Sequence, residues 1–178
     1  MTSPANAACV QDWSVSDLCD AHDRNAECGL QIFQSGLQSY GGHRRYFGRV
    51  VTVGPATGSA LSLTSTLEAP GLGQVLMVDG KADPAQALVG DRLAGLAVEN
   101  GWAGIIVNGY VRDSNALSGF ALGIHAWGTR PNKSYTLGEL RRGDSFDMAG
   151  VRVREGLWVY VDSDGMILAT RALGTSSN

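Results

Sequence analysis

Two short, uninterrupted apolar runs with a helical segment between them most constrain how this 178-residue chain can fold. Residues 75–78 are Val-Leu-Met-Val, and residues 104–108 are Gly-Ile-Ile-Val-Asn. Such runs are typical of strands buried on both faces, as in a parallel sheet. Between them, residues 91–100 place apolar side chains at helical spacing; Asp91 is suited to cap this helix and Gly101 to follow its end. The pattern predicts a β-α-β unit with a right-handed crossover.

The flanking segments predict further elements of one α/β domain. A helix is expected to begin after Ser14, whose hydroxyl can form a capping box with Asp17. The other expected elements are an edge strand within 29–38, a strand over 47–53, a helix over 59–67, a helical turn at 84–88, a short helix over 112–119, a strand over 124–127, and a hairpin of 158–161 with 166–169. We therefore expect a single domain, 1–178, with a parallel central sheet plus antiparallel strands, and with loose ends at 1–12 and 171–178.

The composition excludes several classes of protein. The 24 glycines are roughly twice the usual ~7% share, and because 44% of residues are hydrophobic, they indicate tight turns in a folded chain rather than disorder. A net charge of -3 argues against direct binding of nucleic acid. No apolar run approaches the ~18 residues of a membrane span and no signal peptide is visible, so we expect a cytoplasmic protein. The three cysteines, Cys9, Cys19 and Cys28, form no C-x-x-C and are expected to be reduced thiols.

Motifs for several catalytic and cofactor-binding sites are missing from the sequence. Gly80-Lys81 lacks the Ser or Thr that completes a phosphate loop. No glycine-rich cofactor loop follows a strand, which argues against a dinucleotide-binding protein and against a methyltransferase. The histidines, His22, His43 and His125, share no metal-ligand spacing and are expected to be packing or surface residues, while a Cys–His nucleophilic pair is left open.

The candidate site rests on the spacing between Asp91 and Arg112-Asp113. In the β-α-β interpretation, a helix of about ten residues descends roughly 15 Å and a five-residue strand returns roughly 16 Å. These residues should therefore meet outside the carboxyl ends of the strands, where open α/β sheets bind ligands. A plainer alternative is a helix cap at Asp91 and an exposed Arg-Asp turn, and composition and spacing alone favour it.

The chemistry of these residues suits an anionic substrate and a divalent cation. Free N–H groups over 91–93 could hold a carboxylate, and Arg112 offers a planar fork for a carboxylate or a developing oxyanion. Asp91 and Asp113 offer hard oxygen ligands, few enough that Mg2+ or Mn2+ would keep waters and positions open for substrate.

Several motifs resemble those of the RraA-like family, the class II 4-hydroxy-4-methyl-2-oxoglutarate aldolases. The likeness covers roughly residues 15–170 and is carried by DLCD at 17–20, SYGG at 39–42, VDG at 78–80, ALVGD at 87–91, NGWAG at 100–104, GYVRD at 109–113 and DG at 164–165. Asp91, Arg112 and Asp113 meet the D-x20-R-D motif of the family's enzymes. Branches that regulate a ribonuclease can lose the second acidic residue of that motif, so its presence favours the enzyme.

The resemblance implies a metal-dependent pyruvate aldolase with a swivelling β/β/α fold, acting on an oxo-diacid as a homotrimer or hexamer. Asp113 would hold Mg2+ or Mn2+, partly through water, and Arg112 together with the metal would stabilise the pyruvate enolate. A water oriented by the metal or by Asp91 would take the hydroxyl proton. Oxaloacetate decarboxylation would use the same enolate. The implied substrate-binding residues are Gly90, Asp91, Arg92, Leu93 and Arg112.

The sequence also departs from the family pattern and leaves a second function open. Lys81-Ala82-Asp83-Pro84 stands where a glycine-rich run is usual, 54–58 replaces an acidic segment, and Gly156-Leu157-Trp158 replaces Gly-Asp-Trp. These changes bear on substrate choice and on the loop over the site. The alternative function is a non-catalytic regulator that binds and inhibits a ribonuclease of the RNase E type through an acidic ring surface.

Overall fold

The computed structural model describes residues 13–22, 25–56, 61–133 and 139–174. Its helices and strands are, in chain order, α1 (Val15–His22), η1 (Ala26–Cys28), β1 (Gln31–Ile32), β2 (Gln38–Ser39), β3 (Tyr46–Pro55), α2 (Leu63–Glu68), β4 (Val75–Asp79), β5 (Ala87–Val89), α3 (Asp91–Glu99), β6 (Gly104–Val111), α4 (Ser114–Leu117), β7 (Gly123–Thr129), β8 (Leu140–Arg142), β9 (Phe146–Met148), β10 (Val151–Val153), β11 (Trp158–Val161) and β12 (Met166–Ala169). The expected leader 1–12, the expected helix start at 59 and the end of the expected tail lie outside the described residues.

The predicted β-α-β unit is confirmed as β4–α3–β6, at the centre of a mixed sheet. β3, β4, β6 and β7 pair in parallel, in that order. Antiparallel strands flank them, including the predicted β11–β12 hairpin, so the full order is β1-β12-β11-β3-β4-β6-β7-β2, with β5 beside β6 and β8 beside β3. The fold class is therefore the expected α/β class, with parallel and antiparallel strands in one sheet.

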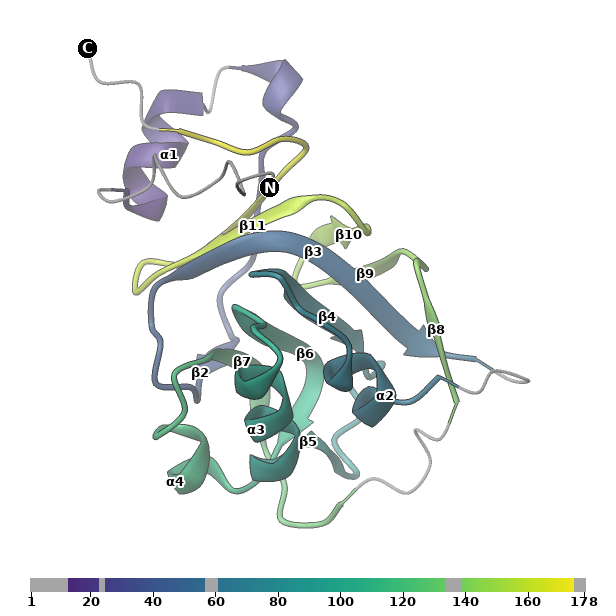
Figure 1. Cartoon of the computed structure of the whole chain (residues 1–178). Coiled ribbons are helices and arrows are strands. Elements are labelled where there is room, and N and C mark those ends of the chain that lie inside the picture. Colours follow the sequence, from purple (N-terminus) through teal and green to yellow (C-terminus); the bar gives the residue numbers. More distant parts are fainter. Residues whose placement is uncertain (1–12, 23–24, 57–60, 134–138, 175–178) are drawn as a thin grey trace, which may run out of the picture.

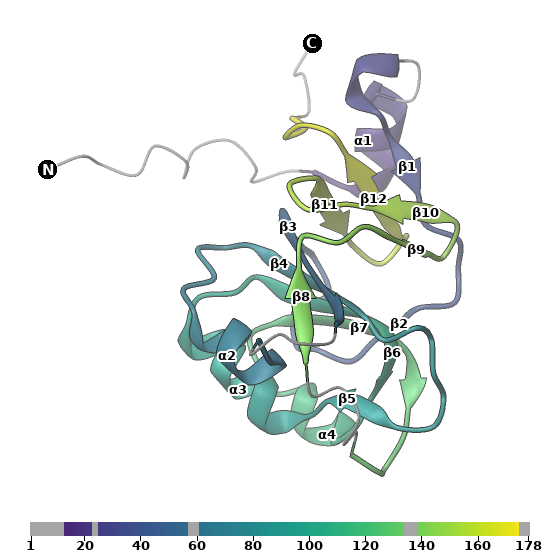
Figure 2. The same ribbon diagram turned by 90° about the vertical axis from the view of Figure 1, so that its right-hand side faces the viewer.

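Different layers bury the two faces of the parallel strands, which explains their unbroken apolar sequences. Leu76 and Val78 belong to the core shared with α2 and α3, whereas Val75 and Met77 belong to the core shared with β9, β10 and β11. Figures 1 and 2 show α2, α3 and α4 on one side of the central strands, and α1 beyond the β11–β12 hairpin. Within the described ranges, no helix is long and apolar enough to span a membrane.

The start and the end of the described chain meet at α1. The Ser14 half of the predicted capping box is confirmed, because the Ser14 hydroxyl accepts a hydrogen bond from the Asp17 N–H (3.0 Å). Residues 171–174, the described part of the expected tail, pack beside this helix. There the Leu173 N–H donates to the Tyr160 hydroxyl (2.7 Å), and Leu173 is buried.

Several local expectations near the predicted site are wrong. Instead of a helical turn at 84–88, Ala87–Val89 form the strand β5, because their backbone pairs with the end of β6. β6 itself does not end at residue 108 but continues to Val111, since β5 and β7 both pair with its last residues. Gly90, and not Asp91, caps α3, so that Asp91 is the first helical residue.

Tyr46 lies against two glycines that face each other across β6 and β7. A Cβ atom would lie 2.5 Å from the Tyr46 ring at Gly104, and 2.2 Å from it at Gly123. The Tyr46 hydroxyl lies 2.8 Å from Nδ1 of His125, and both residues are buried. Burial raises the pKa of Tyr46 above its usual value and lowers the pKa of His125 to about 4. The pair is therefore neutral near pH 7.

We predict that Gly123→Ala lowers the free energy of unfolding by about 1–3 kcal/mol, because the new methyl group would overlap the Tyr46 ring. Gly95→Ala is the matched control, since a Cβ there meets only Phe120 at 3.7 Å and alanine favours the helix by about 0.5–1 kcal/mol. Urea unfolding followed by circular dichroism measures both. Equal stability of Gly123→Ala and the wild type would contradict the predicted overlap.

We also predict that His125 makes the fold sensitive to acid. Its folded pKa of about 4 lies below the unfolded value of 6.5, so the folded protein binds fewer protons between these values. The contribution of neutral His125 to the free energy of unfolding is fully present above pH 6.5 and is lost as the pH falls toward 4. The total loss is up to about 3 kcal/mol. Unfolding free energies of the wild type and of His125→Gln, measured across this range, should show the steeper loss in the wild type. Parallel curves would show that His125 is not the responsible group.

Candidate functional site

Asp91, Arg112 and Asp113 meet at the carboxyl end of β6, where they line a hollow of about 560 Å³. Arg112 directly follows β6, and its N–H donates to the Val89 carbonyl of β5 (2.9 Å). Oδ2 of Asp113 lies 3.2 Å from Nε of Arg112 and accepts a long hydrogen bond from the Asp91 N–H (3.4 Å). The structure thus brings the start of α3 and the end of β6 to one place.

The backbone at Gly90 and Asp113 explains this close approach. A Cβ at Gly90 would lie 2.5 Å from Oδ2 of Asp113 and 3.1 Å from Nε of Arg112, so any other residue would displace these groups. Asp113 has left-handed backbone angles (φ 57°, ψ 36°), which Asp and Asn adopt more readily than most residues. Its side chain makes no capping hydrogen bond to α4 and faces the start of α3 instead.

The donor groups of the hollow fit a hydrated divalent cation. Among the described residues, no group of three or more His, Cys, Asp or Glu side chains forms a metal cage. Mg2+, however, commonly uses one or two carboxylates and keeps several waters. Asp113, whose side chain is 35% exposed, and Asp91 provide such carboxylates at a solvent-open position.

The side chains of Arg92 and Leu93 do not enter the hollow. Nη2 of Arg92 donates to the Thr64 hydroxyl of α2 (2.9 Å), and Leu93 packs on the apolar core. The Arg92 N–H donates to Oδ1 of Asp91 (2.6 Å). The contribution expected from Gly90–Leu93 is therefore limited to the backbone at the start of α3 and the Asp91 carboxylate.

Arg130 lines the same hollow and was not singled out by the sequence. It directly follows β7, its guanidinium lies 5.1 Å from the centre of the Tyr110 ring, and its Nε donates to the Pro84 carbonyl (2.5 Å). None of the ion pairs formed between described residues includes Arg130. The sequence signal for Arg130 was its position at the carboxyl end of a third parallel strand. Because that strand was expected to stop at Trp127, Arg130 was not placed at its end.

The Cys–His pair left open by the sequence is found away from this hollow. Sγ of Cys28 lies 3.6 Å from Nδ1 of His22, and Nε2 of His22 lies 3.0 Å from the Gly174 carbonyl. Cys28 is fully buried and also accepts a hydrogen bond from Arg171 (3.1 Å). Since substrate cannot reach this thiol, the pair holds α1 and the following turn against the rest of the fold.

Comparison with known proteins gives consistent matches over most of the chain. The family model described as RraA-like, aldolase/RraA, matches residues 15–168. A relative from Laribacter hongkongensis, provisionally named a 4-hydroxy-4-methyl-2-oxoglutarate aldolase, is 42% identical over 156 residues, which cover 88% of this chain and 95% of the relative.

Two solved structures share the fold. One, described as an S-adenosylmethionine:2-dimethylmenaquinone methyltransferase from Geobacillus kaustophilus, is 38% identical with a TM-score of 0.81, covering 93% of this chain and 99% of that chain. The other, the RNA-processing inhibitor RraA from Thermus thermophilis, is 32% identical with a TM-score of 0.82, covering 94% and 98%. With a family match over residues 15–168 and relatives of nearly equal length, this chain belongs to the RraA-like family.

Proposed function

We propose that this protein is a divalent-metal-dependent lyase that cleaves 4-hydroxy-4-methyl-2-oxoglutarate and similar oxo-diacids to pyruvate, and that it also decarboxylates oxaloacetate. The observation that carries the proposal is the hollow in which Arg112 and Arg130 stand with Asp91 and Asp113. The two arginines suit the two carboxylates of an oxo-diacid substrate. The carboxylates of Asp91 and Asp113 suit a hydrated cation and proton transfer. The aldolase names of the relatives support the same reaction. A cytoplasmic homotrimer or hexamer belongs to the proposal through the family resemblance.

Arg112 binds the carboxylate and the keto oxygen of the pyruvyl half. Its main chain is fixed to β5 and its Nε lies 3.2 Å from Oδ2 of Asp113, and these two contacts hold the guanidinium at the hollow. When the C3–C4 bond of the substrate breaks, its electron pair moves onto the pyruvyl half as an enolate. The negative charge gathers on the keto oxygen, where a preorganised guanidinium stabilises it.

Asp113 and Asp91 serve the cation and the proton. Asp113 would hold Mg2+ or Mn2+, which would supply further positive charge near the keto oxygen. Asp91 orients a water that accepts the C4 hydroxyl proton, so that C4 becomes a carbonyl. The C3 carbon of the enolate then takes a proton and yields pyruvate. Loss of CO2 from oxaloacetate leaves the same enolate, which explains the second activity.

Likeness to the RNA-processing inhibitor RraA favours a second candidate function, the binding and inhibition of a ribonuclease. Such a regulator would not need enolate chemistry at Arg112. Efficient pyruvate release, together with no stable complex in a pull-down with an RNase E-type enzyme, would decide for the lyase.

We predict that Arg112→Gln and Asp113→Asn each lower kcat/KM for pyruvate release by about 100-fold or more, because the first removes the positive charge beside the developing enolate and the second removes the carboxylate that would hold the cation. Asparagine tolerates the left-handed backbone of residue 113, so the fold is kept. Arg141→Gln and Asp144→Asn are matched controls from an exposed ion pair (2.7 Å) outside the hollow. A lactate dehydrogenase-coupled assay with and without Mg2+ measures the rates. Full activity in both site variants, or in excess chelator, would refute the mechanism.

We predict that Arg130 recognises the carboxylate remote from the pyruvyl half. Arg130→Gln should lower kcat/KM for 4-hydroxy-4-methyl-2-oxoglutarate by about 10- to 100-fold through loss of a charge-assisted hydrogen bond. With 4-hydroxy-2-oxopentanoate, which lacks that carboxylate, the substitution should change the rate little. If both substrates lose activity equally, Arg130 instead supports the shape of the hollow.

A further inference from the structure

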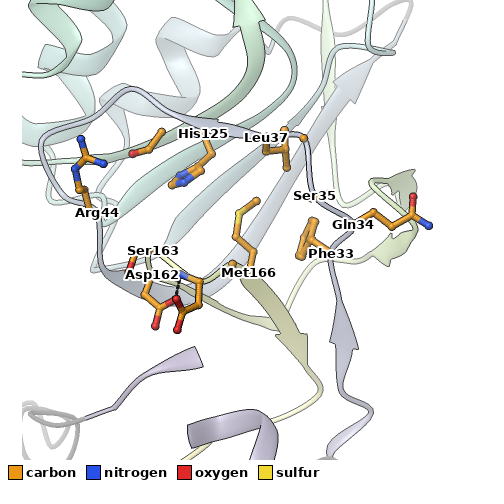
Figure 3. Close-up of a pocket in the computed structure, with 13 residues that line it drawn as sticks. Phe33, Gln34, Ser35, Leu37, Arg44, His125, Asp162, Ser163 and Met166 are labelled. Carbon is orange, nitrogen blue, oxygen red and sulfur yellow. Dashed lines mark hydrogen bonds between the residues drawn. The ribbon is translucent and has the colours of Figure 1, made fainter. Parts of the chain in front are cut away.

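A second cavity, of about 320 Å³, lies near the opposite edge of the sheet, where β3 and β7 begin (Figure 3). The connection between β1 and β2, residue His125 of β7, and the turn between β11 and β12 form its walls. It shares no lining residue with the hollow around Arg112. Neither the family match nor the proposed reaction gives it a role.

His125 directs a hydrogen-bond donor into this cavity. The residue is only 7% exposed, and its Nδ1 lies 2.8 Å from the Tyr46 hydroxyl. If Nδ1 were the donor, the buried Tyr46 hydroxyl proton would have no acceptor among the described residues, so we assign the imidazole proton to Nε2. Within the part of the chain that the structure describes, this Nε2–H has no partner, and Figure 3 shows the ring at the cavity wall.

Arg44 supplies a positive charge at the same cavity. No ion pair between described residues includes it. The nearby carboxylates already have donors, because Asp162 accepts from the Val15 N–H (2.7 Å) and Asp164 accepts from the Ser16 hydroxyl (3.0 Å). These hydrogen bonds attach α1 to the β11–β12 turn, and although both acids also line the cavity, neither forms an ion pair with Arg44 within the part of the chain that the structure describes.

The rest of the cavity offers an apolar surface. Phe33, Leu37 and Met166 lie on the side away from Arg44 in Figure 3. At about 320 Å³ the cavity lies at the small end of the range of ligand pockets, so it suits a small ligand. A cavity with two donors at one end and an apolar wall at the other matches a small amphipathic anion.

We propose that this cavity binds a small monocarboxylate with an apolar chain or ring. Its carboxylate accepts hydrogen bonds from Arg44 and from Nε2 of His125, and its apolar part packs against Phe33, Leu37 and Met166. The site is independent of the proposed lyase reaction, because binding is measured without catalysis and involves none of the residues of the hollow.

Calorimetric titration of the full chain with hexanoate and benzoate tests the proposal, with the His125 ring followed by NMR. Saturable binding that shifts the His125 ring resonances is expected. Hexanamide, which has the same size without the charge, and inorganic phosphate, which lacks the apolar part, should each bind at least about tenfold more weakly.

Arg44→Gln should weaken hexanoate binding by about 10- to 100-fold, and His125→Gln by a similar factor. Arg154→Gln is the matched control, because Arg154 is also exposed but lies outside the cavity lining. Since Arg44 is exposed, its replacement should leave the unfolding curve unchanged and keep the test valid if His125→Gln fails to fold. The proposal is overturned if neither acid binds at about 10 mM, if hexanamide binds as well as hexanoate, or if Arg44→Gln binds like the wild type.

Discussion

The pairing of β3 is the constraint on which both candidate sites depend. Residues 46–49 of this ten-residue strand pair antiparallel with β11, residues 50–53 pair parallel with β4, and its end pairs with β8. One continuous strand therefore makes the antiparallel and parallel parts share a sheet and its twist. The amino ends and the carboxyl ends of the parallel strands are therefore held apart by the paired backbone of the strands themselves and not by loops. The hollow around Arg112 forms at the carboxyl edge, and the cavity beside His125 forms near the amino edge.

Much of the fold could be predicted because burial on both faces appears directly in the sequence as an unbroken apolar run. The segments β4, α3 and β6, and the hairpin β11–β12, are also close in the chain, so local patterns suffice to pair them. The meeting of Asp91 with Arg112 is found even though β6 is three residues longer than expected. β5 compensates for the greater length of β6. Its Val89 carbonyl accepts a hydrogen bond from the Arg112 N–H, so the start of α3, which follows β5, lies beside the end of β6.

The unpredicted features depend on contacts between distant segments. β5 has three residues, too few for a strand pattern, and only its pairing with the end of β6 makes it a strand. Arg130 reaches the hollow through the register of β7 on β6, which shifts between Val107 and Tyr110 and leaves no trace in either sequence. Tyr46 and His125 are separated by 79 residues, so no local pattern links them. The roles assigned to Asp91, Arg112 and Asp113 rest on resemblance and chemistry, since their spacing alone also suits an ordinary turn.

The loop after β4 places two residues with side chains in a backbone conformation that favours glycine. Lys81 and Ala82 both have positive φ (57° and 52°), which costs a residue with a side chain about 1–2 kcal/mol. Asp79, which is 4% exposed, offsets part of this cost by accepting hydrogen bonds from the Lys81 N–H (3.1 Å) and the Asn108 amide (3.2 Å), and by pairing with Nζ of Lys81. A glycine at position 81 would relieve the backbone but leave a buried carboxylate without its cation. Since Asn108 also accepts from the Trp127 indole (2.9 Å), the loop is tied to β6 and β7, the two strands that position the arginines of the hollow.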